Sequence, residues 1–410
     1  MINPAAIQSR SAWRSFDASG RIVAAVLALL ALVSAVHATG NAMALMGSMD
    51  IGVSMRSAQV LQRDNPYPLY WNGLRETRGP PTYGQNPFAM EPVQMPSALM
   101  LLWPYSMLSW PELKVSWLVS NFAFTAGLLM LAFRRFLPGQ PLWLYISISA
   151  LFVMSTSWRN VITNGQHGLA SLFFLFAAAE LADRRRSVAA GLALTAGLLK
   201  YSMTMFLLPW FVLKRQWTAL AIAIGLHLMM TVGVALWLHT NPFTLVTGAL
   251  ETGRKVLLVS GYLDLFAVFN GMGAPPAIPG AVSLACLAAI MWKAVTRRVQ
   301  NEDFFLAALC FLSVTLMYHR QYDFIVLIVP LMIAIRHIAT QRFAACMTFA
   351  SVLLVWFLDR PVVFLTDWLE SRNSAYYYFM AFIWYATLVV LLTTAFASRR
   401  PATSPAPVRV

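Results

Sequence analysis

Long apolar stretches recur from one end of the chain to the other, and short polar gaps separate them. Each stretch approaches the ~20 residues with which an α-helix crosses a hydrocarbon core about 30 Å thick. Because lipid offers the backbone no hydrogen-bond partners, such stretches must be helical. The pattern predicts about twelve spans, beginning near residues 22, 113, 141, 168, 187, 201, 217, 280, 303, 324, 343 and 377. We therefore expect residues 1–410 to form one all-α, polytopic membrane domain.

Composition supports a membrane protein and excludes other classes. Hydrophobic residues make up 59% of the chain and charged residues only 11%, far from the usual balance of a soluble domain. The net charge of +14 comes from basic gaps between apolar stretches rather than from a basic soluble module, so we expect no nucleic-acid partner. These gaps are Arg134–Arg135, Arg184–Arg186, Lys214–Arg215, Arg297–Arg298, Arg336 with Arg342, and Arg399–Arg400. The positive-inside rule assigns them, and both termini, to the cytoplasm.

With those gaps inside, the remaining polar segments lie outside, and two of them are long: residues 41–111 and residues 240–279. Within the first, the stretch from Pro96 to Trp110 is apolar but interrupted by proline, so we expect a helix in the outer interface rather than a span. The first apolar stretch lacks a small-residue cleavage site and is expected to be a retained helix. Residues 401–410 are rich in proline and are expected to form a disordered cytoplasmic tail.

Lys200 is the one charged residue in the apolar segment between Arg186 and Lys214. That segment has 27 residues, too many for one straight span and few for two. A pair of short helices with Lys200 at the turn fits this length. An ammonium group at membrane depth needs an anionic partner. The alternative is that Lys200 extends to the outer headgroups.

Polar side chains that could carry chemistry fall on the outer side under this topology. Acidic residues are scarce, 16 in 410, and Asp50 follows the first span, where a carboxylate can serve as a general base. The other clusters are Arg56 with Tyr67, Asn164 with Gln166, Lys200, and His319 with Arg320, Tyr322 and Asp323. One acid with several cations and amides suits group transfer from a phosphorylated lipid, because cations stabilise the leaving phosphate.

Several of these residues also have a purely structural explanation. Asp50 could cap a helix beginning near Val53, with its carboxylate on the first backbone N–H groups. The dipeptide Asn164–Gly165 is a common turn. Arg320 and Asp323, three residues apart, could form a local ion pair that holds a loop.

Further polar residues also have a structural explanation. His319 could be a histidine satisfied at a helix end, which leaves its function open. Asp264 and Arg159 are expected at the surface or against lipid headgroups. The sequence contains no tight cluster of His, Asp and Glu, so we expect no metal and no other cofactor.

The order of these clusters resembles the GT-C membrane glycosyltransferases, and within them glycosyltransferase family 87. The resemblance covers the chain from Asp50 to about Pro330. It is carried by Asp50 with Asn65–Pro66–Tyr67, the proline-rich Pro96–Pro104, Asn164–Gly165–Gln166, Leu199–Lys200, and Tyr318–His319–Arg320 with Tyr322–Asp323. The dipeptide His167–Gly168 stands where the family more often has an apolar residue and Asn.

The resemblance implies a GT-C-like fold and an inverting hexosyltransferase, with mannose as the favoured sugar and a polyprenyl phosphate as its carrier. The acceptor would be a lipid or glycan of the cell envelope, and the active site would face the outside of a bacterial inner (plasma) membrane. By the same resemblance, Asp50 is the general base. Binding of the donor phosphate is expected from Lys200, His319 and Arg320, and substrate binding from Arg56, Tyr67, Asn164, Gln166, Tyr322 and Asp323.

A lipid or solute transporter (flippase) is the main alternative, and a structural membrane subunit is the third. A transporter would show related halves and polar groups near mid-membrane. This sequence shows no clear internal repeat and places its polar clusters towards one face. A deep outer cavity closed to the cytoplasm would favour the enzyme, and a path open to both faces would favour transport.

Overall fold

The computed structural model describes residues 17–45, 50–67, 93–257, 264–271, 273–275, 277–296, 298–317, 320–357 and 373–396. All secondary structure in these ranges is helical, which confirms the expected all-α class. The α-helices are α2 (Asp17–Leu45), α3 (Asp50–Val60), α5 (Pro96–Ser106), α6 (Trp110–Phe136), α7 (Leu142–Met154), α8 (Thr156–Asn164), α9 (Gly168–Asp183), α10 (Ser187–Gly197), α11 (Tyr201–Thr204), α12 (Leu208–Leu213), α13 (Trp217–Trp237), α14 (Pro242–Leu257), α15 (Leu265–Gly271), α16 (Ala277–Val295), α17 (Glu302–Thr315), α18 (Ile328–His337), α19 (Arg342–Phe357) and α21 (Asn373–Phe396). The 3-10 helices are η2 (Leu198–Lys200), η3 (Met205–Leu207) and η4 (Gln321–Leu327). The expected tail, residues 401–410, lies outside the described residues.

Within the described residues, five segments are long and apolar enough to cross a bilayer. They are Asp17–Ala44, Trp110–Phe136, Ser187–Leu213, Trp217–Trp237 and Ala277–Val295. The chain is therefore a multi-pass membrane protein by the length and composition of its helices. A helix begins close to each of the twelve positions expected from the hydropathy pattern. How many of the shorter ones cross the membrane stays a prediction.

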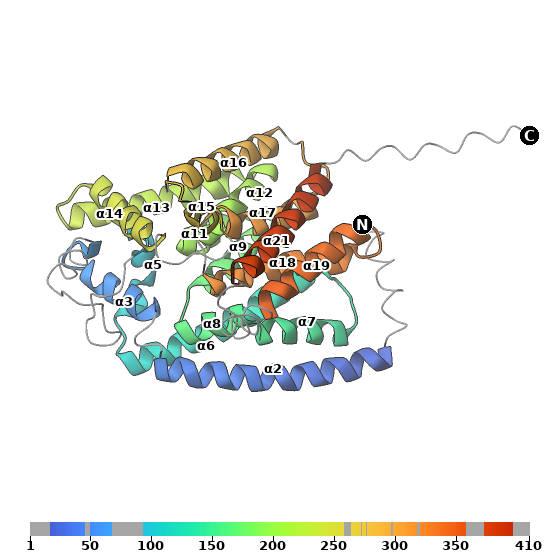
Figure 1. Ribbon diagram of the computed structural model, residues 1–410. Helices are drawn as coiled ribbons and strands as arrows, with labels where there is room; N and C mark the ends of the chain where they lie inside the picture. Colours follow the sequence, from blue (N-terminus) through green and yellow to red (C-terminus); the bar gives the residue numbers. More distant parts are fainter. Residues whose placement is uncertain are drawn as a thin grey trace, which may run out of the picture.

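The polar segments expected outside the membrane carry helices of their own. Residues 41–111 include α3 and α5, residues 240–279 include α14 and α15, and α8 lies in the short connection between α7 and α9. Helix α5 ends before α6, and the Ser109 amide donates to Glu112 Oε2 (2.9 Å) to cap the new helix. A helix separate from α6 is therefore present in this stretch, and its position in the outer interface stays a prediction. In Figure 1, α3, α5 and α14 gather at one end of the molecule.

The helices differ in how completely they are buried. Helix α2 lies along the edge of the molecule (Figure 1) and exposes apolar side chains such as Ile22 and Val36. A helix that is apolar but exposed is typical of contact with lipid. Helix α17 is the opposite case, because every residue from Phe304 to Thr315 is buried. It forms the centre around which the other helices pack.

The segment from Ser187 to Leu213 turns back on itself. Arg135, at the end of α6, donates to Asp183 Oδ2 (2.7 Å) at the end of α9, and its guanidinium lies 4.8 Å from the ring centre of Trp210 in α12. The segment therefore starts and ends at the same end of the bundle, although its length and hydropathy alone would allow one crossing. Lys200 leaves helical geometry (φ −111°, ψ 72°). The predicted helical pair with Lys200 at its turn is confirmed.

Charged side chains gather at the end of the bundle that holds Arg135. Lys214 pairs with Glu302. Asp303 forms an ion pair with Arg336 (3.2 Å to Nη1) and a hydrogen bond with His337 Nε2 (2.8 Å). These pairs join the ends of α12 and α18 to the start of α17. Since α9 has 16 residues, its two ends lie about 24 Å apart. The loops at the start of α9 and this charged layer are thus separated by most of the thickness of a hydrocarbon core, which is about 30 Å.

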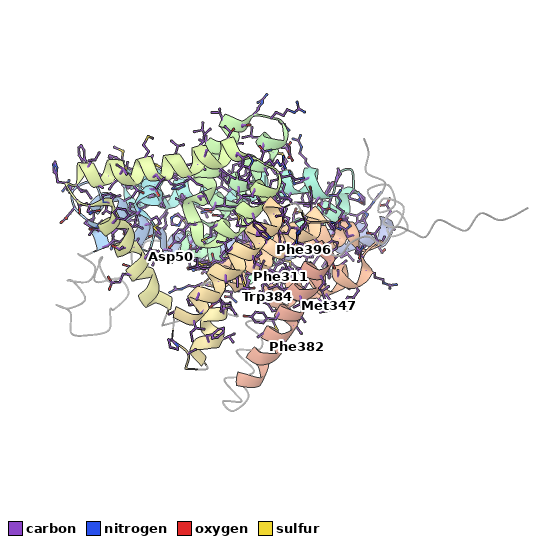
Figure 2. All side chains as sticks on the ribbon, turned by 90° about the horizontal axis from the view of Figure 1, so that it is seen from above. Asp50, Phe311, Met347, Phe382, Trp384 and Phe396 are labelled. Atoms are coloured by element: carbon purple, nitrogen blue, oxygen red, sulfur yellow. The ribbon has the colours of Figure 1, made fainter. Side chains whose placement is uncertain are left out.

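Aromatic packing from the C-terminal helices supports η4. Phe311 and Trp384 stack with ring centres 4.3 Å apart, between α17 and α21 (Figure 2). Trp384 Nε1 donates to Thr315 Oγ1 (2.8 Å), and Trp356 Nε1 donates to the Phe324 carbonyl (3.0 Å). Because these indole N–H groups are buried, each bond also satisfies a donor that would otherwise be costly. The ring centre of Trp384 also lies 5.7 Å from that of Phe324 in η4, so α19 and α21 both pack against η4.

Candidate active site

Four segments that are far apart in the sequence bring polar side chains together. Gln166 Nε2 donates to the Asp50 carboxylate, and Gln166 Oε1 accepts from Lys200 Nζ (3.0 Å). Lys200 also forms an ion pair with Asp323, and its ammonium lies 4.3 Å from the ring centre of Tyr322. We call Asp50, Gln166, Lys200, Tyr322 and Asp323 the polar cluster. It links α3, the turn before α9, η2 and η4 through one continuous set of contacts.

Gln166 is placed by the turn between α8 and α9. Gly165 has left-handed geometry (φ 64°, ψ 39°), which glycine adopts without a steric penalty and which commonly ends a helix. The backbone N–H of Gln166 donates to the Val161 carbonyl (3.0 Å). The indole Nε1 of Trp117 donates to the Gly165 carbonyl (2.9 Å). Asn164–Gly165 therefore forms a turn that ends α8, as predicted from the sequence for this dipeptide. The turn presents Gln166 to Asp50 and Lys200.

Lys200 is held by its backbone as well as by its side chain. Its amide donates to Ser171 Oγ (2.9 Å), one turn into α9, and the Ser171 side chain is fully buried. A helix break leaves backbone N–H groups without intrahelical partners, and an unmet donor in a buried position is costly. Ser171 provides the partner for Lys200. The break that points the ammonium at the polar cluster is therefore built into the packing of α9 against η2.

Asp323 uses its two carboxylate oxygens differently. One pairs with Lys200, and the other accepts the Arg320 backbone N–H (3.2 Å) to cap the start of η4. Asn160 Nδ2 donates to Gln321 Oε1 (2.7 Å), which ties η4 to α8. The expectation that Lys200 has an anionic partner is confirmed, and that partner is Asp323.

Asp50 lies where its carboxylate feels opposing effects. Desolvation at this partly buried position raises the pKa of Asp50 above its ordinary value, and the positive charges of Arg320 and Lys200 and the bond from Gln166 act in the other direction. The net direction is upward. A carboxylate with a raised pKa accepts a proton more readily than an exposed one, which suits a general base. Helix α3 begins at Asp50, not near Val53, so the expected start was three residues too late.

His167 neighbours the polar cluster and went unrecognised as a site residue in the sequence. Its ring packs edge-on against Trp117 with centres 5.4 Å apart, and the side chain is buried. Burial and then the charge of Lys200 lower the pKa of His167 to about 3, so the imidazole is neutral at ordinary pH. Ser171 and Trp117 were missed as well. Ser171 lies four residues, or one helical turn, after His167. This spacing, which places two residues on the same helix face, was the only signal in the sequence that pointed to Ser171.

Other residues named from the sequence lie elsewhere or outside the described residues. The Arg56 guanidinium lies 5.4 Å from the ring centre of Trp110. Tyr67 is buried, donates to the Gln94 carbonyl (2.6 Å) and packs against Gly248. His319 lies outside the described residues.

The acidic residues show one further difference from the expectation. Asp264 is fully buried, so its predicted position at the surface was wrong. Its charge acts on Tyr385 of α21 instead. In the part of the chain that the structure describes, no three His, Cys, Asp or Glu side chains gather into a group that could hold a metal ion.

Comparison with known families identifies the class of enzyme. The model of glycosyltransferase family 87 matches residues 95–319, more than half of the chain. The chain belongs to glycosyltransferase family 87. No curated protein and no solved structure matches it. The match includes Gln166 and Lys200, whereas Asp50 precedes it and Arg320 and Asp323 follow directly after its end.

Membership in the family confirms the resemblance drawn from the motifs and makes the protein a membrane glycosyltransferase. A glycosyltransferase takes a sugar donor and an acceptor. Transport and a purely structural role are therefore not supported as the main activity.

Proposed function

We propose that this family 87 enzyme transfers a hexose, with mannose favoured, from a polyprenyl-phosphate-linked donor to a lipid or glycan of the cell envelope, with inversion at the anomeric carbon. The observation that carries the proposal is the bridge of Gln166 between Asp50 and Lys200. It fixes a carboxylate and an ammonium on either side of one amide. A base and a cation held in this way can act on the two ends of a displacement reaction.

The proposed reaction is a single displacement. Asp50 takes the proton of the acceptor hydroxyl while the acceptor oxygen forms a bond to the anomeric carbon. The bond from that carbon to the phosphate oxygen breaks, and the electron pair leaves with the polyprenyl phosphate. Lys200 and Arg320 stabilise the leaving phosphate. His319, which directly precedes Arg320 in the sequence, is expected to do the same. A single displacement inverts the anomeric carbon and needs no second carboxylate as a covalent nucleophile.

The donor specificity can be tested directly with the purified full-length protein. It is incubated with a panel of labelled polyprenyl-phosphate sugars and an envelope-lipid extract, and products are followed by mass. We expect a hexose to be transferred from the polyprenyl phosphate, with the mannosyl donor used best. Transfer from nucleotide sugars alone, with none from any lipid-linked donor, would overturn the proposal.

We also propose that the polar cluster faces the outside of a bacterial inner membrane and that both termini are cytoplasmic. The charged layer of Arg135, Lys214 and Arg336 lies about 24 Å away across the bundle, and the positive-inside rule places such a layer in the cytoplasm. The proposal includes a GT-C-like arrangement of the helices, in which the polyprenyl-phosphate donor binds at this outer side.

Cysteine labelling in intact cells tests the orientation. With the three native cysteines replaced by alanine, Asp64→Cys and Ala277→Cys should react with a membrane-impermeant reagent, whereas Arg298→Cys should react only after the cells are opened. All three positions are exposed side chains. The reverse pattern would invert the topology and place the polar cluster on the cytoplasmic side.

A further inference from the structure

Within the described residues, three side chains surround the ammonium of Lys200. An ammonium group carries three N–H donors and no acceptor. Gln166 Oε1 accepts one at 3.0 Å, Asp323 Oδ1 pairs with it, and the ring of Tyr322 covers another side at 4.3 Å. The Lys200 side chain is only 15% exposed, so little of the ammonium is open to a ligand. A phosphate that binds Lys200 therefore competes with these three partners.

Asp323 is the partner best suited to being replaced. Its carboxylate oxygen offers the ammonium the same kind of charged acceptor as a phosphate oxygen does. Gln166 is neutral, and it also donates to Asp50, so its departure would break the bridge between the base and the cation. An incoming anion would also repel the Asp323 carboxylate at close range. Exchange of one anion for another keeps the charge of Lys200 balanced throughout.

The second oxygen of Asp323 shows how the exchange can occur without unfolding η4. It accepts the Arg320 backbone N–H at 3.2 Å, and this cap does not involve Lys200. The carboxylate can therefore release the ammonium and still cap the helix. Trp356 holds the next residue, Phe324, by its carbonyl at 3.0 Å, so the backbone of η4 stays fixed from the other side.

We infer that the Asp323 carboxylate is the resting occupant of the anion position on Lys200, and that the phosphate of the incoming substrate displaces it. The inference rests on the proposed function only in taking a prenyl phosphate as the physiological anion. It assigns Asp323 a role opposite to the one expected from the sequence. The sequence predicts that Asp323 binds substrate and so strengthens substrate binding. The structure leads us to expect that Asp323 competes with the phosphate for Lys200 and so weakens phosphate binding.

The test compares binding of polyprenyl phosphate without sugar to the wild-type protein and to Asp323→Asn. Asparagine is neutral, and its one side-chain oxygen can still accept from the Arg320 N–H, while its NH2 group takes the place of the carboxylate oxygen that faces Lys200. We expect Asp323→Asn to lower the Kd by about fivefold or more, which corresponds to about 1 kcal/mol. The matched control is Asp183→Asn, which removes a carboxylate paired with Arg135 at the far end of the bundle. It should leave the Kd unchanged.

Each outcome bears on the inference. An unchanged or higher Kd in Asp323→Asn would overturn it and leave Asp323 a ligand of substrate or a support for Lys200. If only inorganic phosphate binds more tightly, the lipid source of the anion is wrong. If no variant binds prenyl phosphate and the wild type transfers no sugar from it, the proposed function fails as well. Should Asp323→Asn not fold, Asp323→Thr gives the same test, because its hydroxyl can cap η4 without charge.

Discussion

Asp50→Asn is expected to leave donor binding intact and to reduce turnover by about 10²- to 10⁴-fold, the usual range for loss of a general base. Asparagine has almost the same size as aspartate, and its oxygen can still accept from Gln166 Nε2. The bridge to Lys200 is therefore preserved, together with the position of the cation. What is lost is the ability to take the proton of the acceptor hydroxyl. The measurement is kcat with a labelled polyprenyl-phosphate hexose, alongside the Kd for the donor.

A structural role for Asp50 predicts the opposite result. Asn caps helices about as well as Asp, so a residue that only begins α3 would tolerate the change. Near-normal turnover by a folded Asp50→Asn protein would therefore remove Asp50 from the chemical step. The matched control is Asp64→Asn, which changes an exposed carboxylate just after α3 and should leave kcat unchanged.

The pH dependence of the wild-type enzyme provides a second measurement on the same residue. Asp50 must be ionised to accept a proton, and desolvation raises its pKa above the ordinary 3.8 although Arg320, Lys200 and Gln166 oppose this. Turnover should be full above the raised pKa and fall as the pH drops through it. The acid limb of kcat then lies at higher pH than for an exposed aspartate. The residual activity of Asp50→Asn should lack that limb.

The helices and the turn at Lys200 could be predicted because they follow from local sequence. Apolar stretches of defined length make helices in lipid, and a 27-residue apolar segment between two basic gaps has to turn back. The anionic partner of Lys200 was expected for a similar reason, since a charge at that depth must be paired. Charge balance does not say which acid provides it. Only the tertiary structure shows that Asp323 of η4 is the acid that lies beside Lys200 of η2.

The supporting residues could not be predicted, because their roles depend on tertiary contacts. Ser171 is one small residue in an apolar helix. Its hydroxyl has a structural role because it accepts the backbone N–H of Lys200 where the helix breaks. Trp117 holds the Gly165 carbonyl 48 positions further along the chain. Asp264 shows the reverse error, since an acid in a polar segment was expected at the surface but lies buried near Tyr385. Polar composition locates a segment, but packing decides which side chains are buried.

Lys200→Met is expected to lower stability as well as donor binding, and the two effects can be separated with Asp323. The Asp323 side chain is only 5% exposed, so replacing Lys200 leaves a buried carboxylate without its cationic partner. Breaking a buried pair in this way typically costs about 3–5 kcal/mol. The double variant Lys200→Met with Asp323→Asn removes the stranded charge and should recover most of that loss. Unfolding of the detergent-solubilised proteins measures this part of the prediction.

Binding of polyprenyl phosphate should not recover in the double variant, because the cation that holds the phosphate is absent. The control is Lys214→Met, which breaks the pair with Glu302 at the other end of the bundle. There the side chains of Lys214 and Glu302 are 27% and 52% exposed, and such pairs contribute about 0–1 kcal/mol. Wild-type affinity in the double variant would show that Lys200 only neutralises Asp323. Restored stability without restored binding requires the phosphate to interact with Lys200 itself, which is the result we expect.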